Sequence, residues 1–261
     1  QEVLRWCDHW LKGRDTGIMQ EPMLRAWMQD YVPPQTCYLE RKGRWVAEET
    51  WPSPRIQPQR LALGARGQLG GEWSGTVTIC SPLWVGLTAG EVGRYGQDAD
   101  WPTDQREDDG GSLVFVTEPL TEPLEIRGAP QLHLTLASDK PHALVSVRVN
   151  DVAPNGASTR VAIGHLNLCH RTGHDRPEKL IPRQVTTATV DLDDIAHHFP
   201  AGHRIAVSLS TVYWPIAWPS PELATLTVHL GDSALELPVR PPRPEDGTLR
   251  PFDPPEAAMA D

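Results

Sequence analysis

The chain has 261 residues, enough for one large or two small domains, and 39% of them are hydrophobic, including ten Trp. This composition predicts a packed core, while 26 Pro and 21 Gly predict frequent turns and few long helices. The formal net charge of −10 argues against nucleic acid or an anionic membrane as a partner, and no apolar run approaches the ~20 residues of a membrane span.

Residues 1–13 predict the last turns of a helix. Their apolar residues follow the i, i+3, i+4, i+7 spacing of one helical face: Val3, Leu4, Trp6, Cys7, Trp10 and Leu11. Gly13 is a typical helix terminator, whereas no N-cap residue precedes Glu2. We therefore expect the helix to begin before residue 1, and residues 1–20 to be the remnant of a neighbouring domain.

Residues 21–240 predict a β-domain. Alternation of apolar and polar residues is clearest in 132–136 and 145–149, which predicts strands with one buried and one solvated face. Strands are expected at 24–28, 44–48, 59–63, 113–116, 132–136, 145–149, 161–169, 185–192, 204–210, 223–230 and 234–239.

Turns and long connections indicate the topology. Asn155-Gly156 predicts a tight hairpin, and the last two strands are expected to pair across residues 231–233. The long connections 69–111 and 170–183 favour a Greek key or jelly roll over an up-and-down meander. We therefore expect a mainly β fold, a jelly-roll β-sandwich over 21–240. The Pro-rich tail 241–261 is expected to be extended or disordered.

The four cysteines lie far apart and form no C-x-x-C pair: Cys7, Cys37, Cys80 and Cys169. This spacing supports neither a disulfide scaffold nor a zinc site. We expect four reduced cysteines that pack as small buried hydrophobes, and a cytoplasmic protein. No signal peptide opens the chain, and its first residue is Gln1 rather than Met, which fits an excised segment or a processed product.

The sequence does not contain the nucleophile motif of an α/β-hydrolase. That motif, G-x-S-x-G, has glycines that permit a strained turn between strand and helix. Ser112 and Ser158 have glycine two residues before, but Val114 and Arg160 two residues after. Ser233 lies in a GDSL-like sequence without its companion motifs, so a hairpin turn is favoured there. We expect no catalytic residue in this chain.

Several histidines are candidate metal ligands. His170 and His174 have a zinc-binding spacing, but they lie in a predicted loop, so a surface loop with solvated histidines is favoured there. The other candidate histidines are His165, His197, His198 and His203. The adjacent His197 and His198 cannot face the same way on a strand.

Carboxylate pairs are candidates for a structural Ca²⁺ site: Asp108 and Asp109, or Asp191, Asp193 and Asp194. A solvated acidic loop, or Arg106 paired to a neighbouring carboxylate, is favoured instead. No metal or cofactor is expected, and the sequence has no GxGxxG, no P-loop and no basic patch interleaved with aromatic residues.

Tryptophan precedes proline at four positions: Trp51, Trp101, Trp214 and Trp218. Such stiff loops suit packing on a core or at a seam between domains. A set of tryptophans can also bind sugar rings, but we favour core and seam.

Several separated motifs, in the same order, resemble the C-terminal part of the CocE/NonD hydrolases, which are related to X-Pro dipeptidyl peptidases. These motifs are the helix 4–13 (LRWCDHWLKG), 21–23 (EPM), 104–120 (DQREDDGGSLVFVTEPL) and 201–205 (AGHRI). The resemblance covers nearly the whole chain up to about Val239. Cys7 departs from the family, which commonly has an aromatic residue at this position.

The resemblance implies a parent serine hydrolase that acts on acyl esters, amides or X-Pro dipeptides through a Ser-Asp-His triad. All triad members precede the helix in that family, so the resemblance places none of them on this chain, His9 included. It implies the last turn of the catalytic α/β-hydrolase domain followed by a C-terminal jelly roll similar to galactose-binding domains, which packs on the catalytic domain and walls its cleft.

Two other interpretations stay open. The tryptophans and the jelly-roll pattern suit a stand-alone carbohydrate-binding module. Alternatively, Trp6 and Trp10 would leave an apolar stripe exposed, so the chain would be a dimerising domain and a possible homo-oligomer.

Overall fold

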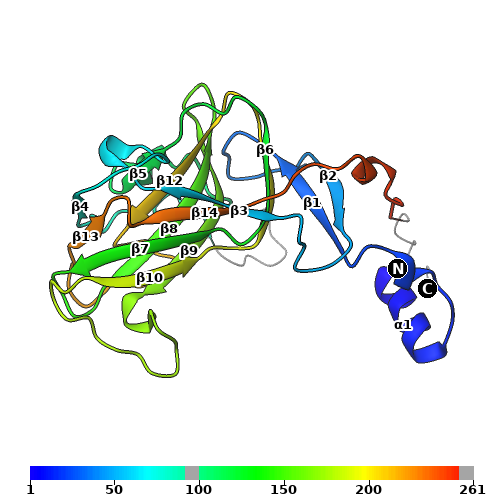
Figure 1. Ribbon diagram of the computed structural model, residues 1–261, viewed down its shortest axis with the longest axis horizontal. Coiled ribbons are helices and arrows are strands. Elements are labelled where there is room, and N and C mark those ends of the chain that lie inside the picture. Colours follow the sequence, from blue (N-terminus) through cyan, green and yellow to red (C-terminus); the bar gives the residue numbers. More distant parts are fainter. Residues whose placement is uncertain (92–99, 253–261) are drawn as a thin grey trace.

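Two β-sheets stack face to face in the computed structural model, which describes residues 1–91 and 100–252 (Figure 1). The smaller sheet contains β5 (Leu113–Val116), β8 (Leu144–Val152), β9 (Ser158–Asn167) and β12 (Arg204–Ser210). The larger sheet contains β1 (Leu24–Asp30), β2 (Gly43–Glu48), β3 (Gln57–Ala62), β4 (Thr76–Ile79), β6 (Leu124–Gly128), β7 (Gln131–Ser138), β10 (Thr186–Asp191), β11 (Ile195–Phe199), β13 (Leu226–His229) and β14 (Ala234–Val239).

The order of the strands follows tertiary packing rather than chain order. The small sheet runs β5-β12-β8-β9, and the main path of the large one runs β2-β1-β11-β6-β14-β7-β13-β4. Strand β10 pairs with β7, and β3 pairs with β14. Such crossovers between strands distant in sequence characterise Greek-key and jelly-roll sandwiches. The expectation of a mainly β sandwich preceded by one helix is confirmed.

The core lies between the two sheets. Leu132, Leu134 and Leu136 of β7 point into it, while His133 and Thr135 alternate with them on the other face. Strand β8 supplies Val145, Val147 and Val149 from the opposite sheet. Each such side chain contributes about 1.5–3 kcal/mol when fully buried, so this layer holds the sandwich together.

The β8–β9 hairpin matches its predicted turn. Val152 and Ser158 close the ladder, and Gly156 between them has φ 85°, a conformation that glycine adopts without strain. The Asn155 side chain accepts a hydrogen bond from the Ala157 amide at 3.0 Å.

The expected pairing of β13 with β14 is wrong. Both strands run antiparallel to β7 along the same edge, where Val228 lies opposite Leu136 and Ala234 opposite His133. The six residue steps from Val228 to Ala234 thus lie opposite only three steps of β7, from Leu136 to His133. The extra residues form a bulge at Gly231. Gly231 has φ 82°, and a Cβ there would clash with the carbonyl oxygen of Trp73. The turn signal at 231–233 therefore marks an interruption of one edge, not a hairpin.

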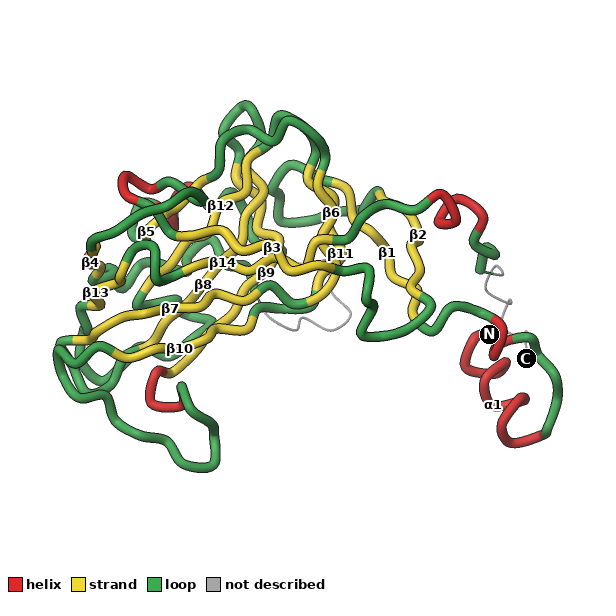
Figure 2. Tube along the Cα trace, viewed as in Figure 1, coloured by secondary structure: helices red, strands yellow, loops and turns green. Residues whose placement is uncertain are grey.

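Three strands lie outside the segments expected from sequence: β4, β6 and β11. Strand β11 pairs antiparallel with β6 and parallel with β1, where Gln29 lies opposite His197. The β1–β2 hairpin thereby extends the large sheet away from the sandwich core, as Figure 2 shows.

Helices are short and peripheral. They are α1 (Glu2–Lys12), α2 (Arg106–Asp109) and the 3-10 turns η1 (Ile18–Gln20), η2 (Ala65–Gly67), η3 (Leu168–His170) and η4 (Pro244–Thr248). Gly13 ends α1 in the left-handed conformation at φ 64°, as predicted. Among the described residues, none of these helices has the length and apolarity to cross a membrane. Turn η4 lies in the predicted irregular tail, whose residues 253–261 are outside the described range.

The cysteines are unpaired but less buried than expected. Cys169 is buried and Cys7 half-buried, whereas Cys37 and Cys80 are exposed. The prediction of buried cysteines is wrong for the last two, because they lie in a loop and at the end of a strand rather than in the core.

Candidate functional site

Helix α1 turns its polar face to the chain and its apolar face to solvent. Arg5 Nη2 donates to Glu21 Oε1 at 2.6 Å and to the Thr16 carbonyl at 3.1 Å. Glu2 Oε1 accepts from Arg250 Nη2 at 2.9 Å. Surface helices ordinarily do the reverse and bury their apolar stripe.

The outward face of α1 is almost entirely apolar, and its exposed fractions are large: Val3 75%, Leu4 60%, Trp6 51%, Trp10 56% and Leu11 80%. The helix lies beyond the β1–β2 hairpin, at the end of the molecule opposite β4 and β13 (Figure 1). A contiguous apolar surface of this kind, which we call the α1 face, marks a protein-contact site.

An open groove beside α1 enlarges this apolar area. It has a volume of about 530 Å³, and its apolar lining includes Trp6, Met19, Met23 and Phe252. Met19 and Met23 are 51% and 68% exposed. Methionines adapt their shape to the surface that covers them, so the groove suits a protein contact.

A second exposed aromatic area, the Trp84 patch, comprises Leu83, Trp84, Leu87, Trp214 and Trp218. The Trp214 amide donates to the Val85 carbonyl at 3.0 Å, which ties the two contributing loops together. The Trp214 and Trp218 rings lie 5.0 Å apart at 79°, an edge-to-face pair. The patch sits on a small buried cluster of Val85, Ala89 and Tyr213, so its backbone is held in place.

The tryptophans do not pack in the core as expected. All ten are among the described residues, and each is exposed or half-buried. The layer between the sheets is filled mainly by aliphatic side chains with Phe115 and Phe199, and Trp73 packs against this core while staying half-buried. The expected role at a domain seam stays a prediction.

Two of the three candidate nucleophilic serines, Ser112 and Ser233, have structural partners. Ser112 Oγ donates to the Asp108 carbonyl at 2.8 Å and accepts from Arg148 Nη2 at 2.9 Å. Ser233 Oγ accepts from the Thr135 amide at 3.0 Å and stabilises the bulge. Ser158 is buried at the end of the β8–β9 hairpin. None of the three is paired with a histidine in the described residues.

The Asp108-Asp109 pair lies against a buried arginine, Arg148. Asp108 is fully buried and accepts from the Gly86 amide and the Thr88 hydroxyl at 2.9 and 2.6 Å. Arg148, 1% exposed, lies 3.4 Å from Asp108 and 3.0 Å from Asp109. Burial raises the pKa of Asp109, although Arg148 opposes this effect.

Two of the other candidate carboxylates, Asp191 and Asp194, also have side-chain partners. Arg106 pairs with Asp104 at 2.7 Å, in agreement with the expected pairing of Arg106 to a neighbouring carboxylate. Asp191 accepts from Gln131, and Asp194 lies 3.6 Å from Arg127. Within the described residues, no group of three or more His, Cys, Asp or Glu side chains is placed to hold a metal ion.

The histidines separate into surface and buried sets. His170 and His174 come together in the predicted loop, with their Nδ1 atoms 3.2 Å apart. His198 pairs with Asp30 at the surface, whereas its neighbour His197 points inward, as strand geometry predicts. Burial and the nearby Arg160 lower the pKa of His165 to about 4.

A buried carboxylate joins two histidines, which the sequence patterns did not indicate. Asp151 of β8 accepts from His197 Nε2 at 2.9 Å and His203 Nδ1 at 2.7 Å, and so links the two sheets. The Tyr31 ring covers His203 at 4.6 Å. Because all partners of Asp151 lie about 50 residues away in the chain, local spacing carries no signal for this cluster.

The fold and these contacts define a β-sandwich domain with exposed apolar side chains on α1 and at the Trp84 patch. The chain belongs to the family of X-Pro dipeptidyl-peptidase C-terminal non-catalytic domains, whose family model matches residues 16–246.

Two curated relatives of this chain are named as esterases. A predicted serine esterase of Mycobacterium bovis, Mb1866c, is 28% identical over 234 residues, covering 80% of this chain and 35% of that protein. Cocaine esterase of Rhodococcus sp. is 23% identical over 199 residues, covering 70% of this chain and 35% of the esterase. The chain thus spans about a third of the length of these relatives.

Solved structures share the fold. An aminopeptidase from a Thaumarchaeota archaeon superposes with a TM-score of 0.69 at 20% identity, covering 90% of this chain and 43% of that one. A CocE/NonD family hydrolase from Staphylococcus aureus gives 0.67 at 15% identity, with 91% and 45% coverage. An α-amino acid ester hydrolase gives 0.58 at 26% identity, with 76% and 39% coverage.

Proposed function

We propose that this chain is the C-terminal β-domain of a CocE/NonD-type serine hydrolase that cleaves acyl esters, amides or X-Pro dipeptides. In this role the domain packs on a catalytic α/β-hydrolase domain of the same protein and walls its cleft. The observation that carries the proposal is the outward apolar face of α1, from Val3 to Leu11.

The free energy of burying apolar side chains favours an α1 face that is covered by another protein surface. Full burial of a Leu, Val or Met side chain stabilises by roughly 1.5–3 kcal/mol, and five large apolar side chains stand exposed on this one helix. Their burial against a neighbouring domain would offset the cost of ordering the helix, which has few apolar contacts of its own. Family membership supports a catalytic domain as this neighbour, because the relatives are hydrolases of about three times the matched length.

The Trp84 patch supports the second half of the proposal. Leu83, Trp84 and Leu87 project from a turn whose backbone is anchored to Asp108 through the Gly86 amide. A rigid turn with exposed apolar side chains suits the wall of a cleft, where the shape of the surface must be set before a substrate arrives.

Domain packing can be tested in the protein that contains this chain. Replacing Leu4 and Trp10 with Gln should separate the melting of the β-domain from that of the catalytic domain and lower hydrolytic activity. Lys12→Gln, on the polar face of the same helix, is the matched control and should leave both unchanged. Cooperative melting and full activity in the double variant would contradict the proposal.

The absence of a catalytic role is tested separately. A fluorophosphonate probe should leave this chain unlabelled when it is incubated alone, while it labels a serine in the catalytic domain of the whole protein. Stoichiometric labelling of the isolated chain would refute a non-catalytic function.

The compartment forms part of the same proposal. Four unpaired cysteines, two of them exposed, fit a reducing cytoplasm. Alkylation of thiols in intact cells before lysis should modify Cys37 and Cys80. Protection of both until a reductant is added would contradict this assignment.

A further inference from the structure

The segment that follows β14 crosses the molecule to reach α1. It leaves the sandwich at Arg240, passes the end of β2 through η4, and arrives at Arg250 and Phe252 beside the helix (Figure 1). We call residues 240–252 the strap. Its contacts with the rest of the domain reach residues 115 to 248 positions earlier in the chain.

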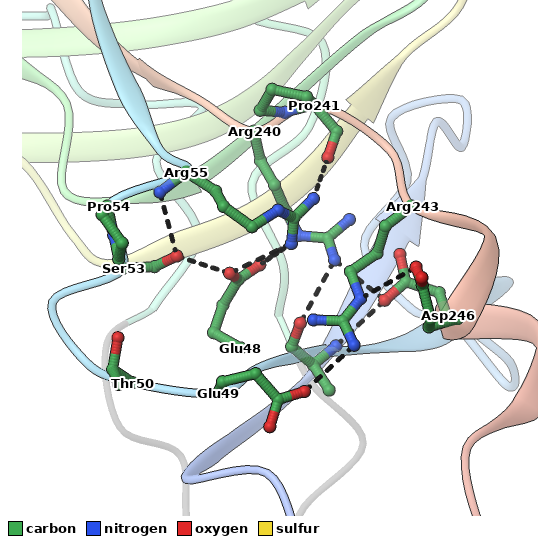
Figure 3. A network of polar contacts seen from close by, with 12 residues as sticks. Glu48, Glu49, Thr50, Ser53, Pro54, Arg55, Arg240, Pro241, Arg243 and Asp246 are labelled. Atoms are coloured by element: carbon green, nitrogen blue, oxygen red, sulfur yellow. Dashed lines mark hydrogen bonds and ion pairs between the residues drawn. The ribbon is translucent and has the colours of Figure 1, made fainter.

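The strap is anchored at its start by a buried ion cluster, shown in Figure 3. Arg240 is fully buried, and its Nε donates to Glu48 Oε1 at 2.7 Å. Its Nη1 donates to Glu125 at 3.3 Å and its Nη2 to Asp246 at 2.8 Å. Three carboxylates around one guanidinium fix both the side chain and the two strands that supply Glu48 and Glu125.

The middle of the strap is held against the β1–β2 hairpin. Asp246 Oδ1 also accepts a hydrogen bond from the Ala47 amide at 3.2 Å, which attaches the strap to β2. Arg55 donates to the Pro241 carbonyl at 2.6 Å, and Arg243 pairs with Glu49 at 3.0 Å (Figure 3). The cluster and the hairpin therefore set the course of the chain toward α1.

The far end of the strap grips the polar face of α1. Arg250 donates from Nη2 to Glu2 and from Nε to Glu21, each at 2.9 Å. Arg5 of α1 contacts the same two carboxylates at 2.6 Å, which makes a cluster of two arginines and two glutamates with alternating charge.

Two further contacts lock Arg250 in place. Arg25 Nη2 donates to the Arg250 carbonyl at 2.6 Å. Phe252 packs on Trp45 with ring centroids 4.7 Å apart, and the Arg25 guanidinium lies 3.9 Å above its ring.

Polar contacts dominate the attachment of α1 to the rest of the chain. Every residue of α1 is exposed or half-buried, so apolar packing alone leaves its direction weakly determined. The connection after it contains Gly13 and Gly17, both with positive φ, which permit several chain directions. The cluster around Arg250 is the contact that selects one of them.

We propose that the strap sets the orientation of α1, with Arg250 as the positioning residue, so that the α1 face is presented in one direction to the catalytic domain. The partner named here rests on the proposed function. The orientation itself is a property of this chain.

The experiment measures the distance between α1 and the sandwich. Nitroxide labels at Lys12→Cys and Thr187→Cys, in a chain whose native cysteines are replaced by Ala, report it by pulsed electron resonance. The starting chain should give one narrow distance distribution. Arg250→Gln should broaden it several-fold, because Glu2 of α1 then loses its link to the strap and keeps only Arg5 of its own helix.

Arg243→Gln is the matched control, since Arg243 lies in the strap but pairs with Glu49 and Glu245, neither of which belongs to α1 or to the cluster around Arg250. It should leave the distribution narrow. In about 1 M salt, where the screening length is only about 3 Å, the starting chain should broaden toward the Arg250 variant. A distribution equally narrow with and without Arg250, or broad in all three chains, would overturn the proposal.

The docking proposal can fail independently. The Leu4 and Trp10 double replacement with Gln leaves the polar face intact, so it should keep the narrow distribution while abolishing association with the catalytic domain. A narrow distribution with unchanged association would refute docking through the α1 face but leave the strap's role standing.

Discussion

Arg240 and Glu48 form an ion pair 2.7 Å long across 192 residues of sequence, with exposed fractions of 0% and 2%. The pair joins the end of β14 to the end of β2, so it couples the sandwich to the hairpin beside α1. Ser53 and Arg55 complete the hydrogen bonding of Glu48. A charge buried this deeply stays only while all its partners are present.

Removing Arg240 should therefore destabilise the domain strongly. We expect Arg240→Met to lower the free energy of unfolding by about 3–5 kcal/mol, because Glu48 and Glu125 are left as buried charges without their shared partner. Urea denaturation measures this change. Arg243→Gln, which breaks pairs with the exposed Glu49 and Glu245, should cost about 1 kcal/mol or less. Equal losses in the two variants would contradict a special role for the buried cluster.

Acid should weaken the same cluster. Burial alone would raise the pKa of Glu48, but hydrogen bonds from Ser53 and Arg240 lower it below its ordinary value of 4.5. A carboxyl whose folded pKa is lowered contributes stability above its unfolded pKa, and this contribution is lost as the pH falls through the folded value. The free energy of unfolding should therefore drop below about pH 4.5.

The Glu48→Gln variant isolates this effect. Its unfolding free energy should be lower at neutral pH and should fall less steeply on acidification, whereas Glu49→Gln should follow the parent curve. Asp109 acts with the opposite sign, because its folded pKa is raised and its protonation favours the folded state. Parallel pH curves for Glu48→Gln and the parent would show that other carboxylates govern acid unfolding.

The isolated chain should self-associate through the α1 face. Sedimentation velocity should show concentration-dependent oligomers that the Leu4 and Trp10 replacements with Gln convert to monomer, since the exposed apolar side chains are then removed. The polar-face variant Lys12→Gln should behave as the parent. A parent chain that is monomeric at every concentration would argue against self-association and against the α1 face as a protein-contact surface.

Sugar binding should be absent. The exposed Trp214 and Trp218 rings meet at 79°, so the two rings do not form one flat platform on which a sugar ring could stack. Titration of tryptophan fluorescence with a panel of oligosaccharides should be flat. A saturable change that Trp218→Ala removes would instead support the carbohydrate-binding alternative.

Local patterns in the sequence determined most of the secondary structure and the family. The apolar spacing of α1, its stop at Gly13, the alternation in β7 and the Asn155-Gly156 turn are short-range properties, because side-chain periodicity and backbone preference act within a few residues. The ordered motifs placed the chain in its family and indicated that no hydrolase nucleophile motif is present.

Tertiary structure decided the direction of the α1 face, the pairing of the strands and the partners of the buried charges, which sequence periodicity does not determine. A pattern shows which residues share a face, but the direction in which that face points depends on distant contacts, so only the fold revealed that α1 holds the chain by Arg5 and turns Trp10 to solvent. Likewise, only the fold revealed that β13 and β14 both pair with β7 along one edge instead of with each other. Buried charges such as Arg240 and Asp151 find partners through topology, since their pairing energy is realised only after distant strands exclude water.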